Sequence, residues 1–93
     1  MANDTPVRFD LGRVLATPGV TARASHTEIM AALSRHAAGD WGEVNDDDKR
    51  ANEAALPVGA RLLSAYATVA GTKFWIITEA DRQSTTILLP EEY

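Results

Sequence analysis

The sequence predicts an α+β fold in which two helices pack on an antiparallel sheet of three or four strands. Residues 60–89 alternate apolar and polar side chains in three runs separated by short polar linkers, which is typical of a β-meander. Two helical patterns precede these runs, each opened by a residue that favours a helix N-terminus. We therefore expect a single domain over residues 11–93 and a flexible N-terminus over residues 1–10.

The three runs are expected to form consecutive strands, joined by a hairpin loop at 69–72 and a polar connection at 80–84. Their alternation places apolar side chains on both faces of the sheet. We assign one face Leu62, Tyr66, Trp75, Ile77, Ile87 and Leu89, and the other face Leu63, Phe74, Ile76 and Leu88. Because the helices cover only one face, and because the last strand is expected at a free edge, a homodimer is also expected.

The first part of the chain contains a short strand pattern and one strong helix pattern. Residues 11–16 are expected to add a strand to an edge of the meander, and residues 17–19 to form a turn, whereas 20–24 is ambiguous. Ser25 and Glu28 form a capping box, which predicts that a helix begins at Ser25. Its apolar stripe has helical spacing and consists of Ile29, Met30, Ala32, Leu33 and Ala37, before the stop signal at Gly39.

A second helix is predicted after Asn45, which is a good N-cap residue. Asp46, Asp47 and Asp48 follow it, where the helix dipole favours negative charge. The body is rich in alanine, and Pro57 is expected to end it before the first strand of the meander.

Composition excludes several classes of protein. The 93 residues include no cysteine, so disulfides and thiolate chemistry are excluded. The sequence lacks a long apolar run and a charged-then-apolar leader, which favours a cytoplasmic protein that does not associate with membranes. The net charge is −4, and the basic residues are scattered along the chain, so direct nucleic-acid binding is not expected. A basic patch would require Arg61, Lys73 and Arg82 to meet on the sheet.

The residues that bear catalytic or metal-binding chemistry do not form a recognisable motif, and we expect no catalytic residue, metal or cofactor. The run Asp46–Asp48 lacks the alternate spacing of a calcium loop and is explained by helix capping. His26 and His36 are separated by roughly 15 Å along one helix, too far to share a metal. We interpret His26 as a surface residue and His36 as a charge at the helix C-terminus. Glu79, Asp81 and Arg82 fit either a solvated turn or an acid–base cluster.

Aromatic and acidic residues are the better candidates for function, as an interface. Trp41 and Trp75 either cover the core or anchor a partner, since indole rings are enriched at protein interfaces. Acidic side chains near Trp41 would then complement a basic surface such as a nucleic-acid channel. The candidate interaction residues are Trp41, Asp40, Glu43, Asp46, Asp47, Asp48, Trp75 and Tyr66.

Four stretches, GDWG, DDDKRANEAAL, GTKFWIITEADR and TTILLPEEY, resemble a family of small, uncharacterised bacterial proteins of plasmids and other mobile elements. Members of that family often take their labels from neighbouring restriction systems. The resemblance spans residues 11–93 and implies a bacterial mobile-element setting, without implying a catalytic residue. The expected order of one strand, two helices and three strands is also similar in topology to the ribosome-dependent endoribonuclease toxins, which are strongly basic.

These observations favour a non-enzymatic accessory protein of a mobile element. We expect it to act by contact with a protein partner, as an inhibitor or regulator of a host defence or restriction complex, in the manner of anti-CRISPR or anti-restriction proteins. Two alternatives stay open: a toxin-like endoribonuclease of a toxin–antitoxin system, and a homodimeric structural domain.

Overall fold

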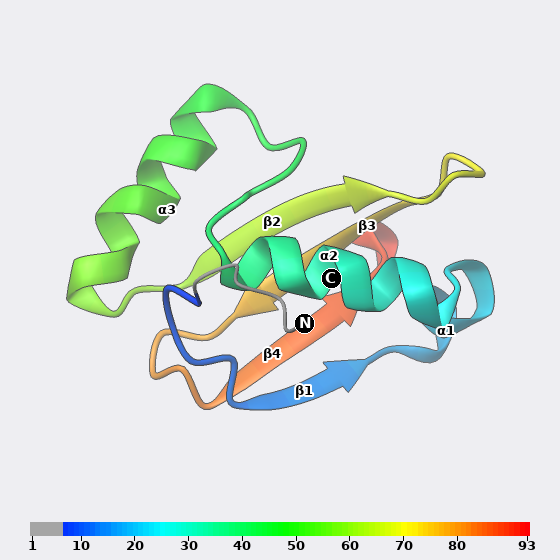
Figure 1. The fold of residues 1–93 in the computed structure, drawn as a ribbon, viewed down its shortest axis with the longest axis horizontal. Coiled ribbons are helices and arrows are strands. Elements are labelled where there is room, and N and C mark those ends of the chain that lie inside the picture. Colours follow the sequence, from blue (N-terminus) through cyan, green and yellow to red (C-terminus); the bar gives the residue numbers. More distant parts are fainter. Residues whose placement is uncertain (1–6) are drawn as a thin grey trace, which may run out of the picture.

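A computed structural model of the chain describes residues 7–93 and confirms the α+β fold (Figure 1). Helices α1 and α2 follow the first strand, α3 precedes the meander, and a short 3₁₀ turn follows the last strand. The elements are β1 (Arg13–Ala16), α1 (Pro18–Arg23), α2 (His26–Ala37), α3 (Asp46–Val58), β2 (Leu62–Ala67), β3 (Lys73–Thr78), β4 (Ser84–Leu88) and η1 (Pro90–Glu92).

The sheet has the strand order β1-β4-β3-β2. Strands β2, β3 and β4 form the predicted antiparallel meander, but β1 pairs with β4 in parallel, so the sheet is mixed rather than purely antiparallel. The expectation of a free edge at the last strand is therefore wrong. The helices carry the chain from β1 to β2 at the opposite edge of the sheet. The meander then brings β4 back beside β1, in the same direction, which leaves β1 and β2 as the two edges.

The register corrects our assignment of side chains to the two faces. Leu62 lies opposite Thr78, and Tyr66 lies opposite Phe74, so these four residues share one face. Trp75 and Ile77 lie on the other face together with Leu63, instead of with Leu62 and Tyr66. The alternation along each strand was predicted correctly, but the pairing between strands was not, because it depends on where each hairpin turns.

Each of the three helices begins at a residue of a type that favours the N-cap position. The side-chain oxygen of Thr17 accepts a hydrogen bond from the Val20 amide, so the predicted turn at 17–19 is in fact the start of α1. Helix α2 begins with the predicted capping box. Helix α3 has the predicted Asn45 cap, but it continues through Pro57 and ends at Gly59, whose positive φ of 70° suits glycine.

The core lies between the helices and one face of the sheet. Side chains of α1 and α2 pack on Tyr66, Phe74, Ile76 and Ile87, with α2 lying over the face of the sheet (Figure 1). A second cluster joins α3 to β2 and contains Trp41, Ala55 and Leu62, with Phe9 and Val44 against it.

The segment that we expected to be flexible, 1–10, is described only from residue 7, and 1–6 lie outside the described residues. The Arg8 guanidinium forms a bidentate pair with the Glu53 carboxylate at 3.0 and 2.9 Å. The Phe9 ring stacks on Trp41 with ring centroids 6.1 Å apart. Residues 8 and 9 are thus anchored to α3 and to the loop before it.

Replacing the central core residues is expected to unfold much of the protein. Phe74→Ala and Ile76→Ala should each lower the free energy of unfolding by about 2–5 kcal/mol, because both side chains are fully buried. The control is Val69→Ala at the hairpin tip, where the side chain is 98% exposed, and its effect should stay within about 0.5 kcal/mol. Urea unfolding followed by tryptophan fluorescence measures all three, and near-neutral core variants would contradict the register.

Candidate functional site

The face of the sheet opposite the helices is only partly covered. The C-terminal turn η1 packs on β3, and the Tyr93 ring lies edge-on to Trp75 with centroids 5.8 Å apart. The Arg61 guanidinium lies over the same Tyr93 ring and donates a hydrogen bond to its hydroxyl at 2.6 Å. This cover buries Ile77 and Leu88 but leaves Trp75 and Leu63 half-buried.

A hollow of about 330 Å³ opens beside this cover, between the loop before α3 and strands β2 and β3. Four predicted interaction residues, Glu43, Asp48, Tyr66 and Trp75, line it together with the Lys73 side chain. Both carboxylates are exposed, and the floor is apolar because it includes Leu63 and Ala65. The hollow thus combines an aromatic surface with negative charge at its rim.

Trp41 and Tyr66 are parts of the core, and their polar atoms are already bonded. Trp41 is 4% exposed, and its Nε1 donates to the Glu53 carboxylate at 2.9 Å. Tyr66 is 2% exposed, and its hydroxyl donates to the Asp40 carbonyl. Burial raises the pKa of the Tyr66 hydroxyl to about 12. Of the aromatic candidates, Trp75 is the one with accessible surface.

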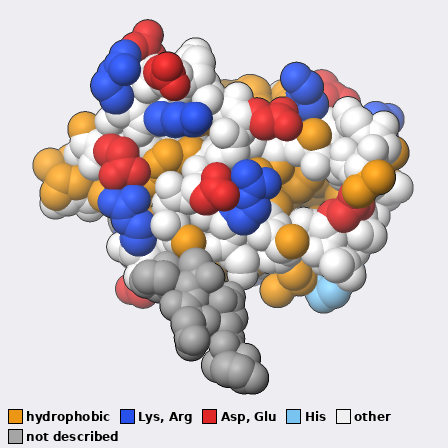
Figure 2. Space-filling model, turned by 45° about the horizontal axis from the view of Figure 1, so that its top comes forward, with side chains coloured by type: hydrophobic (Ala, Val, Ile, Leu, Met, Phe, Trp, Pro, Cys, Tyr) orange, Lys and Arg blue, Asp and Glu red, His pale blue; other side chains and the backbone are white. Residues whose placement is uncertain are grey.

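The acidic candidates do not form one continuous surface. Asp40 is paired with Arg35 at 2.8 Å, which lowers the pKa of its carboxyl, and Asp47 is paired with Arg50. Figure 2 shows acidic and basic side chains interspersed over the visible face of the molecule. Asp46 lies in the first turn of α3, as Asp47 and Asp48 do. The acidic residues at the hollow are therefore Glu43 and Asp48.

The outer edge of β2 is capped at Leu63 and Ala65. The Asn52 side chain of α3 donates to the Leu63 carbonyl at 2.7 Å and accepts from the Leu63 amide at 3.1 Å. The backbone of the loop before α3 continues this pattern, since the Ala65 amide donates to the Trp41 carbonyl and the Glu43 amide donates to the Ala65 carbonyl. Sequence reasoning missed Asn52, although a buried asparagine in an Ala-rich helix is a signal, because asparagine is a poor helix former.

His36 is completely buried, so its interpretation as a charge at the end of a helix is wrong. Its Nδ1 lies 2.5 Å from the Ser64 hydroxyl and its Nε2 lies 2.9 Å from the Thr78 hydroxyl. Thr78 contacts Thr85 at 2.7 Å, and Thr85 donates to the Leu11 carbonyl. A signal existed, because His36 follows Leu33 by three positions on the apolar stripe of α2.

The chain of hydroxyls fixes the position of the imidazole proton. The Leu11 carbonyl only accepts, so Thr85 donates to it and accepts from Thr78. Thr78 then accepts from a protonated Nε2, and the bare Nδ1 accepts from Ser64. Burial, assisted by the charge of Arg82, lowers the pKa of His36 to about 4 and keeps the ring neutral. This Ser–His pair is a structural network, since neither residue has exposed surface.

The three basic residues that would form a cationic patch do not gather. Arg61 precedes β2 and is 3.8 Å from Glu79, whereas Lys73 begins β3 at the other end of the strand pair, about 20 Å away by the rise of a strand. Arg82 donates to the Ala60 carbonyl at 2.6 Å and to the Ala55 carbonyl at 3.4 Å, so its guanidinium caps the end of α3.

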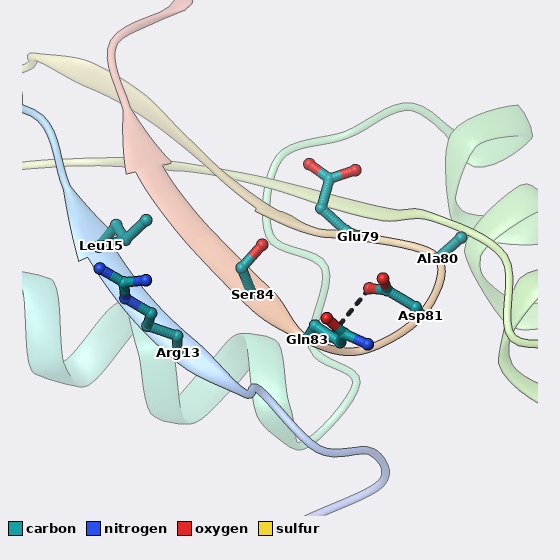
Figure 3. A pocket seen from close by; sticks show the side chains of 7 residues that line it. All are labelled: Arg13, Leu15, Glu79, Ala80, Asp81, Gln83 and Ser84. Carbon is teal, nitrogen blue, oxygen red and sulfur yellow. Dashed lines mark hydrogen bonds between the residues drawn. The ribbon is translucent and has the colours of Figure 1, made fainter.

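A larger and shallower hollow of about 600 Å³ lies between β1 and the turn from β3 to β4 (Figure 3). Arg13 and Leu15 of β1 form one side, and Glu79, Asp81 and Ser84 lie on the other. The Asp81 carboxylate accepts from the Gln83 amide at 3.0 Å and so closes the turn. Glu79, Asp81 and Arg82 thus belong to a turn, and the Arg82 guanidinium bonds to the backbone carbonyls of Ala55, Ala60 and Glu79.

Within residues 7–93, no cluster of three or more histidine or acidic side chains is placed to hold a metal ion. No helix in that same part of the chain is long and apolar enough to span a bilayer. Comparisons with protein-family models, curated proteins and solved structures find no significant match.

The burial of neutral His36 predicts that stability falls in mild acid. The pKa of His36 is about 4 in the folded state and near 6.5 when unfolded, so protons bind the unfolded chain preferentially between these values. The contribution of neutral His36 to the free energy of unfolding is present above pH 6.5. Because of this group, the free energy of unfolding should drop by about 2 kcal/mol between pH 7 and pH 5. Carboxyl groups with a lowered pKa, such as those of Asp40 and Glu53, also stabilise the fold. Their contribution to stability is lost only at a pH below this range.

Urea unfolding of His36→Gln and His26→Gln at both pH values tests this assignment. His26→Gln replaces an exposed histidine on the same helix and should keep the wild-type loss between pH 7 and pH 5. His36→Gln should be less stable at pH 7 but should lack most of that loss. An undiminished loss in His36→Gln would assign the acid sensitivity to other groups.

Proposed function

We propose that this chain acts by protein–protein contact, as a mobile-element accessory protein that binds and regulates a host defence or restriction complex. The observation that carries the proposal is the hollow in which Glu43, Asp48 and the partly exposed Trp75 meet. Aromatic side chains at the centre of a patch with charges around it are typical of protein interfaces.

The chemistry of the hollow indicates the kind of surface it would bind. Trp75 and Leu63 supply apolar area, while Glu43 and Asp48 at the rim favour a Lys or Arg side chain from the partner. A nucleic-acid channel presents such basic side chains, often beside apolar ones, which fits the inhibition of a nucleic-acid-binding complex. Lys73 at the same rim would favour an acidic group on the partner and so help to fix its orientation.

The endoribonuclease alternative has less support. Catalysis on RNA would need several cations around one phosphate, but Arg61 and Lys73 lie at opposite ends of β2 and β3, and Arg82 is bonded to α3. The one feature in its favour is the contact between Arg61 and the Tyr93 hydroxyl on the open face of the sheet.

Charge reversal at the hollow tests the proposal. Glu43→Lys with Asp48→Lys should weaken binding to a partner isolated from a bacterial host by at least tenfold, or about 1.4 kcal/mol. The matched control is Asp46→Lys with Asp47→Lys, which changes the net charge equally but outside the hollow, and it should weaken binding by roughly threefold or less. Affinities come from titration calorimetry, and thermal melting checks that α3 stays folded in both variants.

Two results would contradict the proposal. An equal loss of affinity in both double variants would show that only net charge matters. Cleavage of ribosome-bound message by the purified protein, abolished by Arg61→Ala, would favour the toxin-like enzyme instead.

A further inference from the structure

The two edge strands of the sheet differ in whether their outward backbone groups have hydrogen-bond partners. On β2, the outward backbone groups of Leu63 and Ala65 are paired with Asn52 and with the loop before α3. Strand β1 is the last strand on the other side of the sheet, and all four of its residues are exposed. An unprotected edge strand is a ready template for another strand, and proteins commonly block such edges as β2 is blocked here.

The hydrogen bonds to β4 show which groups of β1 face outward. The Arg13 amide donates to the carbonyl of Gln83, just before β4, and the Thr17 amide donates to the carbonyl of Ile87 in β4. Since backbone groups alternate in direction along a strand, the amides and carbonyls of Val14 and Ala16 point away from the sheet. The side chains of Val14 and Leu15 add apolar surface to this edge, because Val14 is 43% exposed and Leu15 is 44% exposed.

We propose that β1 pairs antiparallel with β1 of a second copy of this chain, about a twofold axis at Leu15. In this register Val14 of each copy bonds with Ala16 of the other, which satisfies the outward groups of both strands. The two neighbouring registers are unfavourable. If the axis is centred on Val14, Gly12 must pair with Ala16 of the other copy, although its φ of 65° is not that of a strand. If the axis is centred on Ala16, Val14 must pair with Pro18 of the other copy, which has no amide hydrogen to donate.

The side chains on the open face complement each other in this register. Leu15 meets Leu15 of the second copy on the axis. Arg13 faces Thr17 of the second copy, whose hydroxyl donates a hydrogen bond to the Glu92 carboxylate at 2.6 Å. The Arg13 guanidinium of each copy therefore lies near the Glu92 carboxylate of the other. Arg13 forms no ion pair with any residue from 7 to 93, and it extends alongside Leu15, away from Asp81 (Figure 3).

The dimer extends the proposed function without depending on it. The hollow of Glu43, Asp48 and Trp75 adjoins β2 and β3, at the other side of the sheet from β1. Pairing through β1 therefore joins two sheets into one and leaves both hollows free, one toward each end. Such a dimer would present two equivalent binding sites to an assembly with repeated subunits.

A single introduced cysteine tests the register, because the chain has no cysteine of its own. Leu15 and its symmetry mate form a non-hydrogen-bonded pair with Cα atoms about 4.5 Å apart, within the range of a disulfide. Under mild oxidation at high micromolar concentration, Leu15→Cys should convert almost completely to a covalent dimer. Val69→Cys, at the exposed hairpin tip, is the matched control and should cross-link at least tenfold more slowly.

Sedimentation of the unmodified protein from micromolar to millimolar concentration completes the test. We expect the dimer fraction to rise over this range, and Arg13→Glu to weaken dimerisation by at least tenfold, because it places a second carboxylate against Glu92 of the other copy. A monomer throughout, equal cross-linking of the two cysteine variants, or an undiminished dimer in Arg13→Glu would each overturn the proposal. Circular dichroism confirms that the variants are folded.

Discussion

The neutral imidazole of His36 is the constraint on which the arrangement of helices and strands depends. It lies on α2 and reaches Ser64 on β2 and Thr78 on β3, and the hydroxyl chain continues through Thr85 to the carbonyl before β1. The imidazole and the three hydroxyl side chains are fully buried, so displacing one leaves another without a partner at a cost of about 1–3 kcal/mol. The network therefore sets the position of α2 over the sheet more closely than apolar packing does, since apolar contacts are not directional.

The geometry of the hollow lined by Glu43, Asp48 and Trp75 depends on that network. The rings of Phe9 and Trp41 pack edge-on against His36, and the loop after α2 is fixed where Trp41 enters the core. Gly42 then passes so close to β2 that a Cβ atom would lie 2.0 Å from the Ala65 carbonyl, so no other residue fits. Glu43 emerges directly after this contact, and its position beside Trp75 follows from buried interactions rather than from the rim itself.

Patterns that act over short distances allowed much of the fold to be predicted. The capping box at Ser25, the Asn45 cap and the alternation in the meander each depend on neighbouring residues. The parallel placement of β1 and the position of Trp75 and Leu63 on one face of the sheet depend on topology and turn geometry, which no local pattern encodes.

The candidate site was also predicted only in part. Glu43, Asp48 and Trp75 proved to be neighbours, but Trp41 and Tyr66 are buried. Both of those have a polar atom that finds an internal partner, and sequence alone cannot distinguish this from an exposed anchor. His36 was misassigned as a charge at a helix end and Asn52 was missed, because polar residues are taken as surface residues until their partners, far along the chain, are known.

The pairing of β1 with β4 brings together segments about seventy residues apart in the chain. During synthesis, β1 leaves the ribosome long before its neighbour β4 exists. Helices α1 and α2 can form early from local contacts, but they must wait for the meander before their apolar faces are covered. Closure of this long loop should therefore be a late and slow step in folding, and the nascent chain carries an unpaired strand until β4 has emerged.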